Sequence, residues 1–273
     1  MKLFETMPDG TKVRLAAYLH EDETVRPTML VCPGGGYTAH AAHEGEPVAM
    51  HWYALGYQVF ILYYTIGETD SVSLALREIA RTMAHIRANA GEWHVDAEKI
   101  AVIGFSAGAH LCANLSVHAH DTAFLAETGL ESEQIAPNTC LLIYPALDMR
   151  LLMEHAREDR RPTWKRVMLG VENDGVPTDE DYLRASPNLH VTENVPPTFL
   201  SHSYSDQTVS VLHSVNYAQR LAECGVPFEM HISEDGWHGY AMCLYHGTDR
   251  PGRDACAQWI PAAERWLRKR FGM

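Results

Sequence analysis

The segment Lys99–Gly108, KIAVIGFSAG, constrains the fold more than any other part of this chain. Apolar, β-branched residues lead into Ser106, and small helix-forming residues follow it. Gly104 and Gly108 lie two residues to either side of the serine, where a sharp strand-to-helix turn leaves no room for a Cβ atom. The pattern therefore predicts a strand, an exposed Ser106 at the turn, and a helix that begins at Ala107.

The rest of the chain alternates between strand-like and helix-like patterns. Runs typical of strands are Lys12–His20 (after a turn at Pro8-Asp9-Gly10), Thr28–Cys32, Tyr57–Tyr64, Lys99–Phe105, Thr139–Tyr144, Thr198–His202 and Phe228–Ile232. Helical spacing covers about Ser73–Asn89, Ala107–His118 and Asp254–Phe271, and Pro261 predicts a kink or a break in the last of these. This alternation predicts an α/β fold with a mainly parallel sheet and helices on both faces.

Between Asp148 and Pro197 the pattern changes to a charged stretch with weak periodicity. We interpret it as an insertion over the C-terminal edge of the sheet. The chain has 273 residues and shows no internal repeat. We therefore expect one domain over residues 1–273, with a small cap-like insertion at about 149–196.

Charge and composition exclude several classes of partner. The formal net charge of −13 disfavours nucleic acids and anionic membranes, which repel an acidic surface. The first residues lack the apolar run of a secretory peptide, and no stretch approaches the roughly 20 apolar residues that span a bilayer. The six cysteines are scattered without a CxxC pair, which favours reduced thiols in a cytoplasmic protein. We expect a small-molecule partner, and the oligomeric state stays open.

A serine on such a turn is typical of a nucleophile that a histidine base activates. His238 follows the strand Phe228–Ile232 in the glycine-flanked loop SEDGWHG, where this arrangement places the base. The chain has 16 histidines, and His246 is the main competitor because it lies only eight residues further on. The sequence favours His238.

The histidine needs a carboxylate that orients its ring. Asp206 lies in the loop after Thr198–His202 and is the only carboxylate between Glu193 and Glu223. The alternative is Asp148, just past the previous strand, which could equally cap a turn. The sequence favours Asp206 as the acid.

Attack on a carbonyl creates an oxyanion that needs preorganised hydrogen-bond donors. The segment Pro33–Tyr37, PGGGY (the glycine loop), lies upstream of the turn, and glycine permits a close approach of the backbone. We expect the amides of Gly35 and Gly36 to serve as donors together with the amide of Ala107. Which of the two glycine amides faces the oxyanion stays open.

The sequence predicts no cofactor and no metal. No Gly-Lys-Ser/Thr follows the glycine loop, and the G-x-G-x-x-G pattern is absent, so neither nucleotide-binding motif is present. His40, His43 and Glu44 lie close together and suggest metal ligands, but an HExxH motif is missing. These side chains are better interpreted as solvated or lining a pocket.

Several residues near the predicted site could contact a substrate. Tyr37 and His40 follow the glycine loop, and Trp237 precedes His238. Trp237 and Trp164 could each offer a flat face to a sugar ring, although packing against the core explains both equally well. We include Tyr37, His40 and Trp237 as candidate pocket residues.

Together these motifs resemble the bacterial acetyl-esterase, acetylxylan-esterase-like branch of the α/β-hydrolases, which is related to the hormone-sensitive-lipase-like carboxylesterases. The matching segments are CPGGGY (Cys32–Tyr37), EGEPVA (Glu44–Ala49), GFSAGAHL (Gly104–Leu111), YPALD (Tyr144–Asp148), SPNLHVTENVPP (Ser186–Pro197), D-x-x-V (Asp206–Val209) and GWHG around His238. The chain departs from the pattern where Cys-Pro replaces the His of HGGG, and where Ser210 replaces the Pro of D-x-x-V-P.

The resemblance implies an α/β-hydrolase fold and a triad of Ser106, Asp206 and His238. It also implies a serine carboxylesterase that needs no cofactor and hydrolyses short-chain esters through an acyl-enzyme, in particular acetyl groups on carbohydrates such as acetylated xylan oligosaccharides. Two alternatives stay open at this point. One is an amide or peptide hydrolase similar to arylformamidases or prolyl peptidases, and the other is a catalytically inert binding protein on the same fold.

Overall fold

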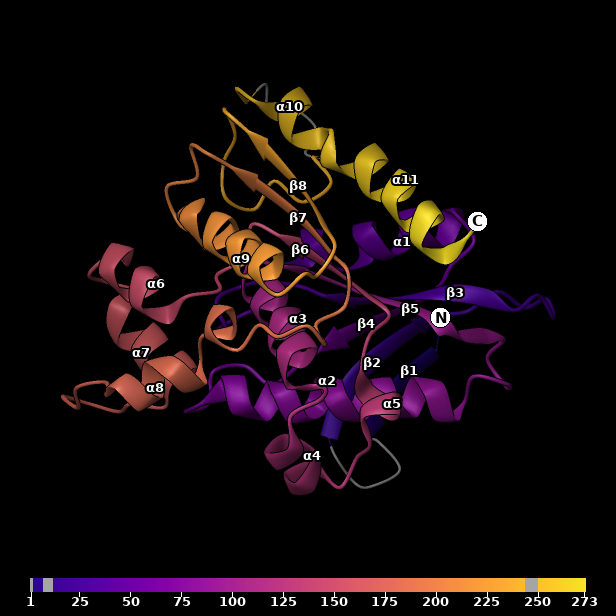
Figure 1. Ribbon diagram of the computed structural model, residues 1–273, viewed down its shortest axis with the longest axis horizontal. Coiled ribbons are helices and arrows are strands. Elements are labelled where there is room, and N and C mark those ends of the chain that lie inside the picture. Colours follow the sequence, from indigo (N-terminus) through magenta and orange to yellow (C-terminus); the bar gives the residue numbers. More distant parts are fainter. Residues whose placement is uncertain (1, 7–11, 244–249) are drawn as a thin grey trace.

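The computed structural model describes residues 2–6, 12–243 and 250–273 (Figure 1). The strands of this part are β1 (Lys2–Thr6), β2 (Lys12–Tyr18), β3 (Arg26–Cys32), β4 (Gln58–Tyr63), β5 (Val95–Phe105), β6 (Thr139–Ile143), β7 (Thr198–Ser203) and β8 (Phe228–Ser233). They form one sheet in the order β1-β2-β4-β3-β5-β6-β7-β8. The pairs β1–β2 and β2–β4 are antiparallel and all others are parallel, which confirms the predicted mainly parallel sheet.

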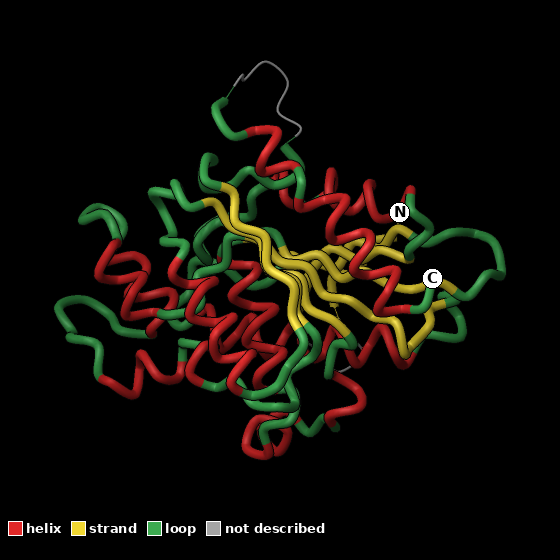
Figure 2. The backbone as a smooth tube through the Cα atoms, turned by 45° about the horizontal axis from the view of Figure 1, so that its top comes forward, coloured by secondary structure: helices red, strands yellow, loops and turns green. Residues whose placement is uncertain are grey.

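Helices cover both faces of this sheet (Figure 2). They are α1 (Glu46–Ala54), α2 (Ser71–Ala88), α3 (Ala107–His118), α4 (Thr122–Thr128), α5 (Ser132–Ile135), α6 (Met149–His155), α7 (Arg161–Leu169), α8 (Asp179–Arg184), α9 (Leu212–Glu223), α10 (Arg253–Ala257) and α11 (Trp259–Phe271), with short 3-10 turns η1 (Ala42–Glu44) and η2 (Pro187–Leu189). None of the helices in the described ranges is long and apolar enough to cross a membrane.

Two apolar clusters, one on each face, hold the helices to the sheet. On one face, Trp52 of α1 and Trp259 of α11 pack with strand residues such as Ile103. On the other face, residues of α2, α3 and α9 pack with strand residues such as Val102. Because both faces are covered, the central strands are continuous apolar runs without a polar side.

Strand β5 positions the site. It lies between β3 and β6, and its last six residues are fully buried. The chain passes from Phe105 directly through Ser106 into α3. Since parallel strands end at the same edge of a sheet, Ser106 lies near the middle of the carboxyl edge, where ligands bind in open α/β sheets.

The C-terminal helix is broken close to Pro261, as the sequence predicts. It divides at Gln258, three residues before Pro261, into α10 and α11. Pro261 therefore lies in the first turn of α11, where a residue without a backbone N–H disrupts no interior hydrogen bond. The sequence pattern does not predict β1, α1, α4, α5 or α9, and the turn expected at Pro8-Asp9-Gly10 lies outside the described residues.

Residues 149–196 contain three short helices, α6, α7 and α8, which lie at one end of the molecule in Figure 1. Two buried histidines connect the core to the residues that directly precede α6 and directly follow α8. The His110 ring on α3 donates through Nε2 to the Ala185 carbonyl at 2.8 Å. The His213 Nδ1 atom on α9 accepts from the amides of Leu147 and Asp148, each at 3.1 Å.

Candidate active site

The turn between β5 and α3 has a strained backbone. Ser106 has φ 51° and ψ −115°, which side-chain-bearing residues rarely adopt. A Cβ atom on Gly104 would lie 2.3 Å from the Gly108 carbonyl oxygen, and one on Gly108 would lie 2.0 Å from the Cys32 oxygen. Both positions therefore require glycine. The same turn places the Ser106 hydroxyl at the N-terminus of α3, clear of the sheet.

Three side chains from separate loops meet at this turn. The Ser106 Oγ atom lies 2.8 Å from His238 Nε2, and His238 Nδ1 lies 2.7 Å from Asp206 Oδ2. His238 follows β8, and Asp206 follows β7. The structure thus brings together the serine, histidine and aspartate that the sequence singled out, in a continuous hydrogen-bonded chain.

The surroundings of Asp206 fix the protonation pattern of that chain. Burial alone would raise the pKa of Asp206, but hydrogen bonds with His202 and His238 outweigh it and hold the pKa well below its usual value. The Asp206 Oδ1 atom also accepts from the amides of Thr208 and Val209. An ionised carboxylate can only accept, so His238 Nδ1 carries the proton and Nε2 is left to accept from the serine hydroxyl.

The predicted oxyanion donors also lie beside Ser106. Gly35, Gly36 and Ala107 line the same pocket as the serine. A Cβ atom on Gly35, which has φ 125°, would lie 2.1 Å from the Ala39 carbonyl oxygen. Within the described part of the chain, the amides of these three residues donate to no protein acceptor. Unpaired N–H groups in such a place can stabilise a developing negative charge.

A buried carboxylate connects the glycine loop to the loop that carries His238. The Glu44 side chain is 3% exposed and accepts from the Gly34 amide at 2.7 Å and from the Tyr144 hydroxyl at 2.8 Å. The Tyr144 oxygen in turn accepts from the Ala241 amide at 3.0 Å. Glu44 and Tyr144 together therefore bridge two loops that are far apart in sequence.

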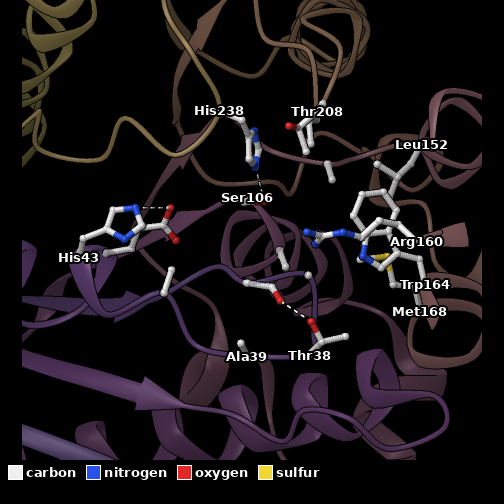
Figure 3. A pocket seen from close by; sticks show the side chains of 17 residues that line it. Thr38, Ala39, His43, Ser106, Leu152, Arg160, Trp164, Met168, Thr208 and His238 are labelled. Atoms are coloured by element: carbon white, nitrogen blue, oxygen red, sulfur yellow. Dashed lines mark hydrogen bonds and ion pairs between the residues drawn. The ribbon is translucent and has the colours of Figure 1, made fainter. Parts of the chain in front are cut away.

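These groups surround a pocket of about 320 Å³ (Figure 3). One side is formed by the glycine loop, His43 and Glu44, and another by side chains of the 149–196 segment. The residues that line it are Gly35, Gly36, Thr38, Ala39, Ala41, His43, Glu44, Ser106, Ala107, Ala146, Leu152, Arg160, Trp164, Met168, Thr208, Val209 and His238.

Two of the predicted pocket residues, Tyr37 and His40, do not line this pocket. The positive φ of Tyr37 turns its side chain into the core, where its hydroxyl lies 2.8 Å from His110 Nδ1. Burial raises the pKa of Tyr37 well above its usual value. His40 packs edge-on against Tyr63 and Tyr64, and burial lowers its pKa.

The two tryptophans also differ from the prediction. Trp237 lies outside the pocket lining; its ring packs against Tyr240, and the Arg250 guanidinium lies 5.3 Å from the ring centroid. For Trp164 the sequence allows either a place in the pocket wall or packing in the core, and the structure shows that it lines the pocket. Its Nε1 atom would lie 3.0 Å from a Cβ on Gly36, so it packs directly against the glycine loop.

Asp148, the alternative candidate for the acid, has a different role. Asp148 caps α6, since its Oδ1 accepts from the Leu151 amide at 3.0 Å. His246 lies outside the described residues. His43, considered with His40 as a metal ligand, places Nε2 3.1 Å from the Gly239 carbonyl oxygen.

Sequence reasoning missed two residues of the site and the role of a third. Glu44, expected to be solvated or to line a pocket, does line it, yet nothing in the EGEPVA pattern marks its carboxylate as buried. His202, the last residue but one of β7, supports Asp206: its Nε2 lies 3.5 Å from Asp206 Oδ2 and 3.0 Å from the Val209 carbonyl oxygen. Arg160 lies in the weakly periodic 149–196 segment, where no pattern predicts a direction for its side chain.

Comparisons with known proteins place the chain among hydrolases. The BD-FAE family model matches residues 15–221. Endo-1,4-beta-xylanase B of Butyrivibrio fibrisolvens is 36% identical over 233 residues, which make up 84% of this chain and 34% of that protein. The chain spans about a third to a half of the length of the curated relatives it matches.

Solved structures share the fold over nearly the whole chain. A carboxylesterase from Lactobacillus plantarum WCFS1 has a TM-score of 0.82 and 25% identity, covering 98% of this chain and 96% of its own. An acetyl ester-xyloside bifunctional hydrolase from Caldicellulosiruptor lactoaceticus has a TM-score of 0.73 and 28% identity, covering 93% of this chain and 89% of its own. These likenesses confirm the predicted α/β-hydrolase fold.

Proposed function

Because this chain belongs to the BD-FAE family, we propose that it hydrolyses carboxylic esters, with Ser106 as nucleophile, His238 as base and Asp206 as orienting acid. The observation that carries the proposal is the hydrogen-bonded chain from Ser106 through His238 to Asp206, at 2.8 Å and 2.7 Å. This geometry has the order and the protonation pattern that nucleophilic serine catalysis requires.

The reaction proceeds in two halves. His238 Nε2 takes the proton of Ser106 as the hydroxyl attacks the ester carbonyl, and the amides of Gly35, Gly36 and Ala107 stabilise the oxyanion. The imidazolium then protonates the departing alcohol and leaves an acyl-enzyme. A water molecule then gives up a proton to the same histidine as its oxygen attacks the acyl carbonyl. The histidine returns that proton to Ser106 Oγ as the bond to the acyl group breaks and the carboxylic acid leaves. Asp206 stays ionised throughout, because its pKa lies well below the usual value.

We propose acetyl esters of carbohydrates as the substrates, acetylated xylan oligosaccharides in particular. Two comparisons support this choice: one structural neighbour is named for acetyl ester and xyloside hydrolysis, and one relative is named a xylanase. A pocket of about 320 Å³ with Trp164 in its wall is compatible with a short acyl group and a sugar ring.

The test compares the wild type with Ser106→Ala on 4-nitrophenyl acetate, butyrate and octanoate, with an acetylated xylo-oligosaccharide in parallel. We expect kcat to fall by at least about 10³-fold in Ser106→Ala, because removing a triad nucleophile leaves only binding and the oxyanion donors. Ser132→Ala is the matched control: Ser132 begins α5, and its hydroxyl contacts His120 rather than the pocket.

The outcomes separate the alternatives. Serine-dependent release of acetate from the sugar supports the full proposal. Activity on the synthetic esters alone supports ester hydrolysis but argues against a carbohydrate substrate. Serine-dependent activity on an amide, with none on the esters, would favour the amide hydrolase. A fluorophosphonate probe that leaves Ser106 unlabelled in the folded protein would favour the inert binding protein.

A further inference from the structure

One cation in the pocket wall has no role in ester cleavage. Arg160 is the only lysine or arginine among the described residues that line the pocket. Its neighbours in the wall are mainly apolar, namely Leu152, Trp164 and Met168. Figure 3 shows its guanidinium extending from this apolar side toward the part of the pocket where Ser106 lies.

Arg160 differs from every other arginine of the 149–196 segment. Each of the other five donates to a protein acceptor: Arg150 to Asp179, Arg157 to Asp159, Arg161 to the Ala156 carbonyl, Arg166 to the Gly67 carbonyl and Arg184 to Asp70. Within the described ranges, the Arg160 guanidinium has no hydrogen bond and no ion pair. The segment thus holds its other guanidinium groups in place and leaves this one available to a ligand.

Among the described residues, the only carboxylate in the pocket lining, Glu44, does not compensate this charge. The Glu44 oxygens are occupied by the Gly34 amide and the Tyr144 hydroxyl. A guanidinium presents a planar set of donors that matches a carboxylate and binds it through two parallel hydrogen bonds. Arg160 is exposed, so salt screens such a pair.

We propose that Arg160 determines specificity by binding a carboxylate on the substrate, so that the protein prefers esters that carry an anionic group. This inference rests on the proposed ester hydrolysis. The carboxylate could belong to the alcohol, as in a uronic acid unit beside an acetylated sugar, or to the acyl chain. Both sources present the same chemistry to Arg160, and the experiment distinguishes them.

The test measures kcat/KM for two substrate pairs. The first pair, 4-acetoxybenzoate and its methyl ester, places the carboxylate on the alcohol. The second, mono-4-nitrophenyl glutarate and 4-nitrophenyl pentanoate, places it on the acyl chain. For each pair the charged-to-neutral ratio is compared between the wild type, Arg160→Gln, Arg160→Lys and Arg157→Gln, after subtraction of the rate with Ser106→Ala. Arg157 is the matched control, since it lies in the same turn, pairs with Asp159 and does not line the pocket.

We expect Arg160→Gln to lower the ratio about three- to tenfold for one of the pairs, the range typical of a partly exposed charge pair. Arg160→Lys should restore part of the ratio, and Arg157→Gln should leave it unchanged. The loss should shrink between about 0.1 M and about 1 M salt, because the Debye length shortens from about 10 Å to about 3 Å. A merely structural role of Arg160 would not produce this salt dependence.

The substrate pair whose charged-to-neutral ratio falls in Arg160→Gln identifies the source of the carboxylate. Equal ratios in wild type and Arg160→Gln for both pairs would overturn the inference, as would an equal loss in Arg157→Gln, which would mean a general effect of charge. If hydrolysis depends on Ser106 while the ratios do not depend on Arg160, the proposed function stands and only this inference fails. If Ser106→Ala keeps the activity of the wild type, the proposed function itself fails.

Discussion

At the scale of single residues, Glu44 shows how a side chain outside the proton-transfer chain can govern the site. Its carboxylate holds the Gly34 amide, next to the proposed oxyanion donors, and reaches through Tyr144 to the Ala241 amide. The four residues of this chain of hydrogen bonds are buried, so each would lose hydrogen-bond energy if its partner were removed. Glu44 therefore acts as a positioning residue for two loops at once.

We predict that Glu44→Gln lowers kcat about tenfold on 4-nitrophenyl acetate with little change in KM. A glutamine amide must turn its NH₂ toward one of the two donors, which breaks a contact and shifts the oxyanion amides. Glu46→Gln is the control, because Glu46 accepts from Tyr18 on the surface and does not line the pocket. A Glu44→Gln protein with an unchanged kcat would show that the glycine loop holds its geometry without this carboxylate.

At the scale of elements, the turn between β5 and α3 depends on two glycines that pack against backbone. We predict that Gly108→Ala destabilises the fold by roughly 3 kcal/mol or more, since its Cβ would lie 2.0 Å from the Cys32 oxygen, and overpacking against backbone cannot relax by side-chain rotation. Urea unfolding measures this change. Gly91→Ala is the control, because its Cβ would meet nothing within 4 Å; equal midpoints for the two variants would contradict the argument.

The same element explains what the sequence could and could not predict. Strand β5 and helix α3 were predictable because a buried parallel strand is continuously apolar and the turn after it needs glycine at fixed positions. The helices of residues 149–196 were not, since α6, α7 and α8 are short and their faces are set by packing on the core. The directions of side chains could not be predicted either. Nothing in the sequence shows that Tyr37 has a positive φ, which turns its ring inward.

At the scale of the whole molecule, buried histidines make the fold sensitive to acid. Burial, with neighbouring histidines adding to it, lowers the pKa of His213 to about 3, and burial lowers the pKa of His110 to about 4. Both rings are therefore neutral in the folded protein at pH values where the unfolded chain, with pKa values near 6.5, already binds protons. Such groups contribute stability that is complete above about pH 6.5 and is lost as the pH falls toward the folded pKa.

We predict that the free energy of unfolding falls below about pH 6.5 by roughly 1.4 kcal/mol per pH unit for each of these two imidazoles. His213→Asn should make the fall shallower by about that amount, because the asparagine oxygen can accept from the Leu147 and Asp148 amides without titrating. Urea unfolding at several pH values between 7 and 5 measures the slope. His120→Asn, an exposed control beyond the end of α3, should leave it unchanged. If wild type and His213→Asn lose stability at the same rate, the connection of the 149–196 segment to the core does not depend on a neutral His213.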